Sequence, residues 1–189
     1  MSDYTALLDA NILYSAPMRD IFLQLAVADL FQVKWTQDIH CEWIEALLKK
    51  EPHRKRTDLE RTRRLMDLAT RDCLIYGYEP LISSLNLPDP RDRHVLAAAI
   101  VGRCDVIVTQ NLKDFPCDAL SSYGIEAQHP DDFLSYHLNL SPRLFCRAIQ
   151  KVRQRLKNPP YNPQEYLSTL RQQGLVTTAS KLTDFISLI

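Results

Sequence analysis

The segment from Leu87 to Phe115 constrains the fold more than any other, because it predicts a loop, a helix, a strand and a second loop in that order. Pro88 and Pro90 stop any preceding element, since proline lacks a backbone N–H and restricts the residue before it. The apolar residues that follow fall three and four apart, as on one face of a helix: Val95, Leu96, Ala99 and Ile100. Gly102 predicts the end of this helix, and residues 106–109 form a short apolar run typical of a strand.

Two aspartates lie at the ends of these elements. Asp92 stands at the predicted start of the helix, and Asp114 lies a few residues beyond the strand. In an α/β unit, helix starts and strand ends share one edge of the sheet, so we expect the two carboxylates to lie near each other. Each has a purely structural alternative: Asp92 could only cap its helix, and Asp114 could cap a short helix after it.

The beginning of the chain predicts a second strand of the same kind. Residues 4–8 form a largely apolar run that ends at Asp9, and continuous apolarity is typical of a parallel strand buried on both faces. Asp9 could simply terminate this strand. The next predicted elements are a helix over 17–30, a strand over 31–36, and a helix from Asp38, as its N-cap, to about Lys50. Glu42 lies one turn into that helix and could equally be an exposed helix residue.

The second half of the chain changes from alternating elements to helices alone. Residues 125–128 predict a closing edge strand, and Pro130-Asp131-Asp132 opens another helix. Three further helices are predicted over 142–157, 163–173 and 176–188. This order predicts an α/β domain over residues 1–136, followed by a helical C-terminal extension over 137–189.

Composition places the chain among ordinary globular proteins of a reducing compartment. The formal net charge is zero, so any affinity for nucleic acid must come from local patches. The five cysteines are odd in number and never in CxxC spacing, which predicts free thiols. Neither a leader-like segment nor an apolar run near 18 residues is present, so we expect a soluble, cytoplasmic protein without a membrane partner.

Four acids are therefore expected at one edge of the sheet: Asp9, Glu42, Asp92 and Asp114. Converging carboxylates repel one another, and such an arrangement costs stability unless a cation lies between them. Ligands that offer only oxygen favour hard divalent ions, which here means Mg²⁺ or Mn²⁺. Further oxygen atoms near this edge come from Asn11, Asp89, Thr109 and Asn111.

Four segments together resemble the PIN-domain nuclease family: LLDANIL, TQDIHCEW, DPRDRHVLAAAI and VTQNLKDF. The resemblance covers about residues 3–136 and implies an α/β/α sandwich with a central parallel sheet. It also implies a divalent-metal-dependent endoribonuclease that hydrolyses phosphodiester bonds in RNA. Many bacterial members are VapC-type toxins restrained by a small antitoxin protein, and the C-terminal helices are similar to an extension on one VapC-like subgroup. The partners implied are thus RNA, an antitoxin and a second copy of the chain in a homodimer.

The resemblance also implies roles for the acids and their neighbours. Asp9, Asp92 and Asp114 would hold the metal, and Glu42 would complete the catalytic set through water or a second ion. Asn11, Asp89, Thr109 and Asn111 would orient ligands or substrate. Asn111 departs from members that carry aspartate there, which leaves the number of metal ions open. Arg91, Arg93 and His94 could reach phosphates, or could simply be exposed helix residues.

Two basic segments could add contacts to RNA. Residues 49–64 carry a net charge of +5 (eight basic residues against three acidic), and a solvated surface is the alternative. Arg147, Lys151 and Arg155 follow Arg143 at intervals of four, so they form a stripe along the helix predicted over 142–157. The stripe could contact an RNA backbone, or could be a solubilising surface or an antitoxin-docking face.

Two rival functions remain open at this point. A phosphoaspartyl hydrolase also starts from an aspartate after the first strand, but that chemistry usually needs Asp-x-Asp, and Asn11 occupies the second position. A non-catalytic RNA-binding or scaffold module with a PIN-like fold is the other rival. Retention of all four acids argues against it.

Overall fold

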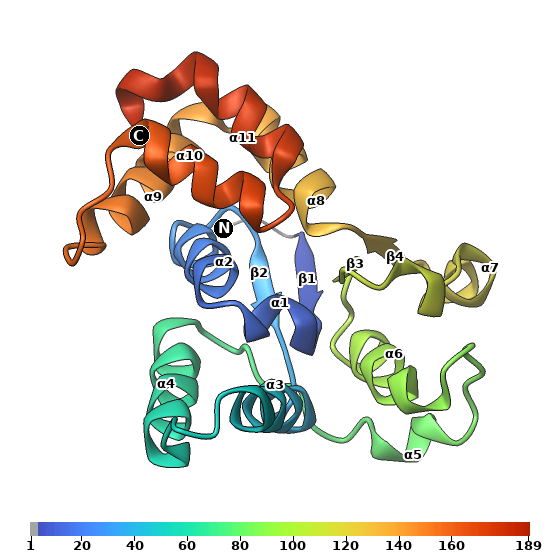
Figure 1. Ribbon diagram of the computed structural model, residues 1–189. Helices are drawn as coiled ribbons and strands as arrows, with labels where there is room; N and C mark the ends of the chain where they lie inside the picture. Colours follow the sequence, from blue (N-terminus) through green and yellow to red (C-terminus); the bar gives the residue numbers. More distant parts are fainter. Residues whose placement is uncertain (1–3) are drawn as a thin grey trace.

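The computed structural model describes residues 4–189 and places a four-stranded, all-parallel sheet between helices (Figure 1). The strand order is β2-β1-β3-β4. The strands are β1 (Thr5–Leu8), β2 (Gln32–Lys34), β3 (Val106–Val108) and β4 (Glu126–Gln128). Every residue of β1 and β3 is buried, as the continuous apolar runs predicted, and the predicted α/β sandwich with a parallel sheet is confirmed.

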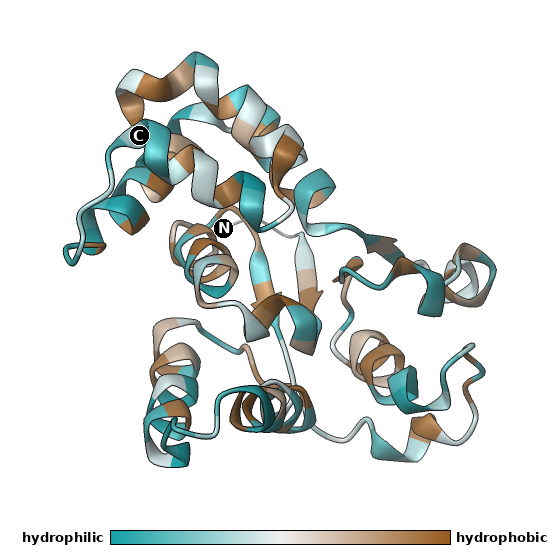
Figure 2. Cartoon of the chain, in the orientation of Figure 1, coloured by the Kyte–Doolittle hydropathy of each residue, from teal (hydrophilic) through white to brown (hydrophobic). Residues whose placement is uncertain are grey.

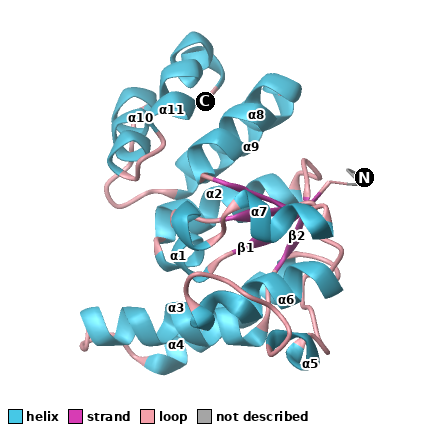
Figure 3. Cartoon of the chain, turned by 90° about the vertical axis from the view of Figure 1, so that its right-hand side faces the viewer, coloured by secondary structure: helices cyan, strands magenta, loops and turns pink. Residues whose placement is uncertain are grey.

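Eleven α-helices surround this sheet within the described residues. Seven belong to the first part of the chain: α1 (Ala10–Tyr14), α2 (Ala16–Val27), α3 (Gln37–Lys50), α4 (Arg56–Ala69), α5 (Glu79–Ile82), α6 (Arg93–Val101) and α7 (Cys117–Leu120). Four follow β4: α8 (Pro130–Leu140), α9 (Pro142–Arg155), α10 (Pro163–Gln172) and α11 (Val176–Leu182). Four short 3-10 turns cover Pro90–Asp92, Leu112–Asp114, Ser121–Tyr123 and Thr183–Leu188. In Figures 1 and 3, α8 to α11 lie above the sheet, and α3, α4 and α6 lie below it.

The C-terminal helices close the amino-terminal edge of the sheet through an aromatic cluster. Tyr4 precedes β1 and Phe31 precedes β2, and both rings pack on Phe133 of α8, with ring centroids 6.3 and 4.9 Å away. His137, one turn further along α8, lies 4.4 Å from the Phe133 ring, and burial lowers its pKa to about 4. This edge is therefore apolar, and α8 joins the extension to the sheet. The division of the chain at residues 136 and 137 stays a prediction.

Several predicted helix boundaries were wrong. Instead of one helix over 17–30, α1 follows β1 directly, and α2 begins at Ala16 because the side chain of Ser15 accepts a hydrogen bond from the Met18 N–H. Thr36, rather than Asp38, caps α3 by accepting from the Ile39 N–H at 3.1 Å. The last predicted helix is α11 followed by the 3-10 turn over Thr183–Leu188.

The helices alternate hydrophobic and hydrophilic residues, as amphipathic surface helices do (Figure 2). The basic segment over residues 49–64 is partly neutralised by surface ion pairs, in which Arg54 binds Glu51 and Arg56 binds Glu45, each at 2.6 Å. All five cysteines are free thiols. Among residues 4–189, no helix is long and apolar enough to cross a membrane.

Candidate active site

Asp9 is the first residue after β1, and three donors orient its carboxylate. Oδ1 accepts from the backbone N–H of Ala10 at 2.7 Å, while Oδ2 accepts from Thr109 Oγ1 at 2.7 Å and from Asn11 Nδ2 at 2.5 Å. Burial raises the pKa of Asp9, and the charge of Glu42 also raises it, whereas the hydrogen bonds from Thr109 and Ala10 oppose this rise. The carboxylate is thus held in one orientation near another acid.

A polar network joins the ends of β1 and β3 behind this carboxylate. Asn11 Nδ2 also donates to Thr109 Oγ1 at 2.9 Å, and Asn11 Oδ1 accepts from the Gln110 N–H at 3.1 Å. Thr109 Oγ1 accepts in turn from the Asn111 N–H at 3.0 Å, and the Asn111 side chain donates to Asp114. The network therefore links Asp9 to Asp114, although 105 residues separate them in sequence.

Asp92 has a clearly raised pKa and lies near several other acids at this edge. Burial raises its pKa to about 6, with further contributions from the charges of four other carboxylates, which are Asp9, Asp89, Asp114 and Glu42. Asp92 is the N-cap residue of α6, as predicted, but its side chain makes no capping hydrogen bond, so capping alone does not explain the carboxylate. Asp89 caps the preceding 3-10 turn over Pro90–Asp92, since its Oδ1 accepts from the Arg91 N–H at 2.9 Å.

Asp114 ends the 3-10 turn over Leu112–Asp114 and does not cap the next helix, because the N-cap of α7 is Pro116. Its charge contributes to the raised pKa of Asp92, so the two carboxylates lie near enough to repel each other. The side-chain amide of Asn111 occupies one of its oxygens.

Glu42 is linked to a histidine that the sequence did not assign to it. Glu42 projects from α3, and its Oε1 lies 2.8 Å from Nε2 of His94 on α6. Burial lowers the pKa of His94, but the hydrogen bond and the charge of Glu42 outweigh it, so the pKa is raised overall. His94 is buried rather than exposed, with 9% of its surface accessible. The two residues are 52 positions apart, and only the packing of α3 beside α6 could reveal the pair.

The predicted RNA-binding arginines fall into two groups. Arg91 is exposed and pairs with Asp89 at 2.7 Å, at the mouth of the acidic site, and Arg93 is partly buried at the start of α6. Arg147, Lys151 and Arg155 are exposed on α9, which packs on α2 and α8. The structure therefore places these three cations on the side of the sheet away from α3 and α6 (Figures 1 and 3).

The site offers oxygen ligands to a hard cation but does not form a closed cage. Among residues 4–189, no three carboxyl, imidazole or thiol groups meet the geometry of a preformed metal site. The donor set nevertheless fits Mg²⁺ or Mn²⁺, since it consists of carboxylates and neutral oxygens. Burial, and after it the charges of neighbouring acids, raises the pKa values of Asp9 and Asp92, and a divalent cation would offset both effects by stabilising the ionised carboxylates.

The fold agrees with the comparisons to known proteins. A family model described as PIN domain matches residues 5–113, more than half of the chain, and the chain therefore belongs to the PIN-domain family. A second family model, described as VapC50 C-terminal domain, matches residues 130–184.

The chain is also similar to a Mycobacterium tuberculosis protein described as "Putative ribonuclease VapC50". It is 45% identical over 98 residues, which cover 52% of this chain and 57% of that protein. No solved structure matches the chain. The predicted resemblance to VapC-type PIN-domain proteins with a helical C-terminal extension is confirmed.

Proposed function

We propose that the protein is a divalent-metal-dependent endoribonuclease that hydrolyses phosphodiester bonds in RNA. The observation that carries the proposal is the position of Asp92, whose carboxyl group lies in the field of Asp9, Asp89, Asp114 and Glu42. A structural role would place such a carboxylate beside hydrogen-bond donors, whereas here its neighbours are mostly other acids. Membership of the PIN-domain family and the similarity to a VapC protein support the same function.

At such a site, some residues would hold the metal ion and others would orient its ligands. Asp9, Asp92 and Asp114 would hold Mg²⁺ or Mn²⁺, which, when bound, polarises a phosphate oxygen and lowers the pKa of water. Thr109 and Asn11 keep the Asp9 carboxylate in one orientation. Asn111 does the same for Asp114. Such supporting contacts commonly determine how well a ligand set works.

Glu42 and His94 form a second functional unit at the edge of the acidic cluster. His94 is buried and restrains Glu42, which is about half exposed, so the carboxylate is directed at the site while it remains accessible. Glu42 would orient the attacking water or complete the cation's surroundings. Arg91 and Arg93 would contact phosphates that flank the cleaved bond, where their positive charge offsets that of the RNA backbone.

The proposed biological context is a toxin that a small antitoxin protein restrains, in the reducing cytoplasm of a bacterium. The similarity to a VapC protein supports this context, and the two exposed cysteines, Cys41 and Cys117, agree with a reducing environment. Copurification from the native host would identify an antitoxin. Sequencing the 5′ ends of RNAs cut on induced expression would identify the RNA target.

The direct test of the reaction is cleavage of single-stranded RNA by the purified protein. Cleavage should require Mg²⁺ or Mn²⁺, stop with EDTA, return on adding the metal back, and be poorly supported by Ca²⁺, whose longer and looser coordination misplaces the water. Binding without cleavage would favour the non-catalytic RNA-binding or scaffold module. Full cleavage in EDTA would refute the metal-dependent reaction, and trapping of Asp9 by fluoroberyllate would favour a phosphoaspartyl hydrolase.

A further inference from the structure

Arg19 is a buried cation that lies outside the acidic site. It belongs to the first turn of α2, and 8% of its surface is accessible. Its Nη1 donates to the carbonyl oxygen of Leu13 at 2.6 Å, which satisfies a carbonyl in the last turn of α1. Its guanidinium carbon lies 5.0 Å from the centre of the Trp43 ring on α3. Arg19 therefore joins the end of α1 to α3.

No acid neutralises this cation directly. Among residues 4–189, no carboxylate forms an ion pair with Arg19. Burial lowers the pKa of Arg19, and the charge of the neighbouring Asp20 opposes this effect without cancelling it. Burying a charged group without an acidic partner costs free energy. The presence of a cation here, in place of an apolar side chain of similar size, therefore favours a role beyond stability.

The ring that Arg19 contacts is itself held in place by buried hydrogen bonds. Trp43 Nε1 donates to His40 Nδ1 at 2.9 Å, and His40 Nε2 lies 3.1 Å from Oδ1 of Asp67 on α4. Trp35 Nε1, just after β2, donates to the same oxygen of Asp67 at 2.9 Å. The two tryptophans and His40 are fully buried. Arg19 thus lies against a fixed surface of α3.

Both helices that Arg19 joins carry residues of the acidic site. α1 begins directly after Asp9 and contains Asn11, whose side chain donates to the Asp9 carboxylate. α3 carries Glu42 immediately before Trp43. The two helices pack against each other. The spacing between Asp9 and Glu42 therefore depends on how α1 lies on α3, which is where Arg19 makes its two contacts.

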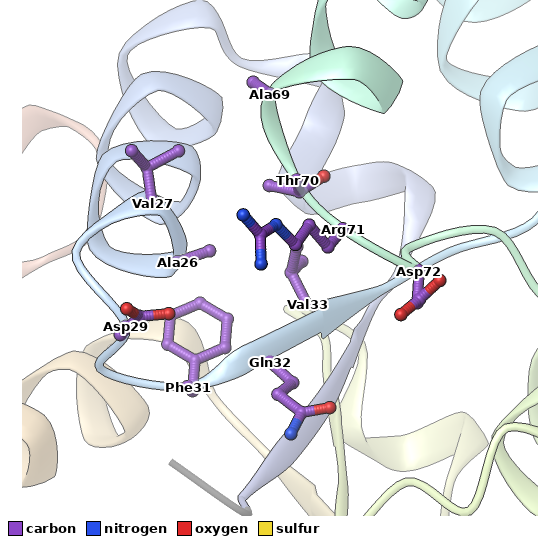
Figure 4. Close-up of a pocket in the computed structure, with 10 residues that line it drawn as sticks. All are labelled: Ala26, Val27, Asp29, Phe31, Gln32, Val33, Ala69, Thr70, Arg71 and Asp72. Carbon is purple, nitrogen blue, oxygen red and sulfur yellow. The ribbon is translucent and has the colours of Figure 1, made fainter. Parts of the chain in front are cut away.

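The other end of α2 is packed less closely. A cavity of about 700 Å³ lies between this end of α2 and residues 69–72, beside β2 (Figure 4). Ala26 and Val27 line the cavity on one side, and Thr70 and Arg71 line it on the other. Because neighbouring segments leave this end of α2 partly unsupported, the buried contacts of Arg19 contribute more to the position of the helix.

We propose that Arg19 is a positioning residue for the acidic site, which holds α1 against α3 so that Asp9 and Glu42 keep a fixed spacing. The inference rests on the proposed function. Arg19 acts through the two helices, since it is buried and makes its contacts with Leu13 and Trp43. A displacement of about 1 Å between reacting groups can lower a rate by about 100-fold, so a loosened α1 should impair the site.

Arg19→Met tests the proposal, because it replaces the guanidinium group with an apolar side chain. The Kd for Mn²⁺ should rise at least about fivefold, since residues that support metal ligands commonly affect affinity by about 10–100-fold. At saturating Mn²⁺, kcat for RNA cleavage should fall at least about tenfold while KM changes less than about twofold, because a buried residue makes no contact with RNA. Arg19→Lys keeps a cation for the Trp43 ring and should recover at least about a third of the wild-type kcat.

Arg153 of α9 is the matched control. It is also partly buried, and it donates to two backbone carbonyls, those of Tyr161 at 2.7 Å and Ile189 at 3.3 Å. These contacts lie in the C-terminal helices, on the other side of the sheet from α3 and α6 (Figures 1 and 3). Arg153→Met should therefore leave the Kd for Mn²⁺ and the cleavage per folded molecule as in wild type.

Wild-type values of the Kd for Mn²⁺ and of kcat in folded Arg19→Met would overturn the inference and make Arg19 a structural residue. If Arg19→Met does not fold, Arg19→Gln takes its place with the same expected losses, and normal values there would equally overturn it. Equal losses in Arg153→Met would overturn it as well, because they would show a general effect of losing an arginine. Absence of both Mn²⁺ binding and cleavage in wild type would instead refute the proposed function on which the inference rests.

Discussion

Two aspartates at helix starts, on opposite edges of the sheet, show how the surroundings can lower or raise the pKa of the same residue type. Asp131 lies in the first turn of α8, and its carboxylate accepts from the N–H groups of Thr177 at 2.7 Å and Thr178 at 2.8 Å in the first turn of α11. Burial raises the pKa of Asp131, but these hydrogen bonds outweigh it and lower the pKa overall. Asp92, at the start of α6, has other acids as neighbours, and its pKa is raised to about 6.

The difference separates a structural edge of the sheet from a functional one. At the amino-terminal edge, each buried polar group of the Asp131 contact has a partner, and aromatic rings fill the remaining space. At the carboxyl-terminal edge, several carboxylates are brought together, and among residues 4–189 no donor hydrogen-bonds to Asp92, which costs stability in the absence of a cation. Repulsion between neighbouring carboxylates of this kind is expected at functional sites and not in ordinary packing.

The largest expected effect is on catalysis. Asp92→Asn should reduce the rate of RNA cleavage by at least about 100-fold, because it weakens the hold on the ion that stabilises charge in the transition state. The metal-free variant should be no less stable than wild type, since one repelling charge is gone. Single-turnover cleavage and urea unfolding measure the two quantities, with Asp132→Asn on α8, an exposed acid at the opposite edge of the sheet, as the control. Loss of stability with normal cleavage by the remaining folded protein would make Asp92 a structural residue.

Asp131→Ala should reduce stability and leave catalysis unchanged, which is the opposite of the effect expected for Asp92→Asn. The free energy of unfolding should fall by about 1.5–3 kcal/mol, because two backbone N–H groups of α11 lose a charged acceptor. Cleavage per folded molecule should stay unchanged. Asp132→Ala, the exposed neighbour in the same turn, should cost less than about 1 kcal/mol. Similar losses of unfolding free energy in Asp131→Ala and Asp132→Ala would contradict the distinction between a hydrogen-bonded and a solvated aspartate.

The pH dependence of stability should have opposite signs at the two sites. The folded-state pKa of Asp131 is lowered, so its contribution is present above the unfolded-state pKa of about 3.9 and is lost as pH falls through the folded-state value. The stability gap between wild type and Asp131→Ala should therefore narrow below about pH 4. The folded-state pKa of Asp92 is raised to about 6. In EDTA the wild type should therefore lose stability relative to Asp92→Asn as the pH rises from about 4 to about 6.

The Asp92 effect should be no more than about 1 kcal/mol, because its partial exposure screens the repulsion. Urea unfolding across this pH range measures both gaps. Gaps that change in the same direction with pH would contradict the assignment of opposite electrostatic environments.

The smallest expected effect concerns the exposed basic stripe of α9. Replacing Arg147, Lys151 and Arg155 with Gln should weaken RNA binding across sequences and leave metal affinity unchanged. Each lost phosphate contact should reduce the slope of log affinity against log salt by about 0.7 for single strands. Replacing the exposed cations Arg71, Arg103 and Arg171, which lie outside both basic segments, with Gln should keep the wild-type slope. An unchanged slope in the α9 variant would make the stripe a solubilising or docking surface.

The sequence predicted the features that follow from periodicity and topology. Two apolar runs identified β1 and β3, and the rule that strand ends and helix starts share an edge placed Asp9, Asp92 and Asp114 at the same edge. It did not reveal α1, since a five-residue helix is too short to show a period. Thr36 and Asp38 are both good N-cap residues, and sequence alone does not tell which one hydrogen-bonds to the helix.

Sequence patterns did not predict the contacts between segments that are distant in the chain. The pair of His94 with Glu42 and the contact of Asp131 with α11 depend on how helices pack, and each partner alone resembles an ordinary surface residue. These features arise from tertiary packing, which local propensity does not encode.

Thermal unfolding with and without Mn²⁺ tests most directly whether the carboxyl-terminal edge binds a cation and the amino-terminal edge does not. Mn²⁺ at a concentration well above its Kd should raise the Tm of wild type and of Asp131→Ala by similar amounts, because a ligand that binds only the folded state stabilises it. The Tm of Asp92→Asn should rise little or not at all. Equal rises in all three proteins, or none in wild type, would contradict the account.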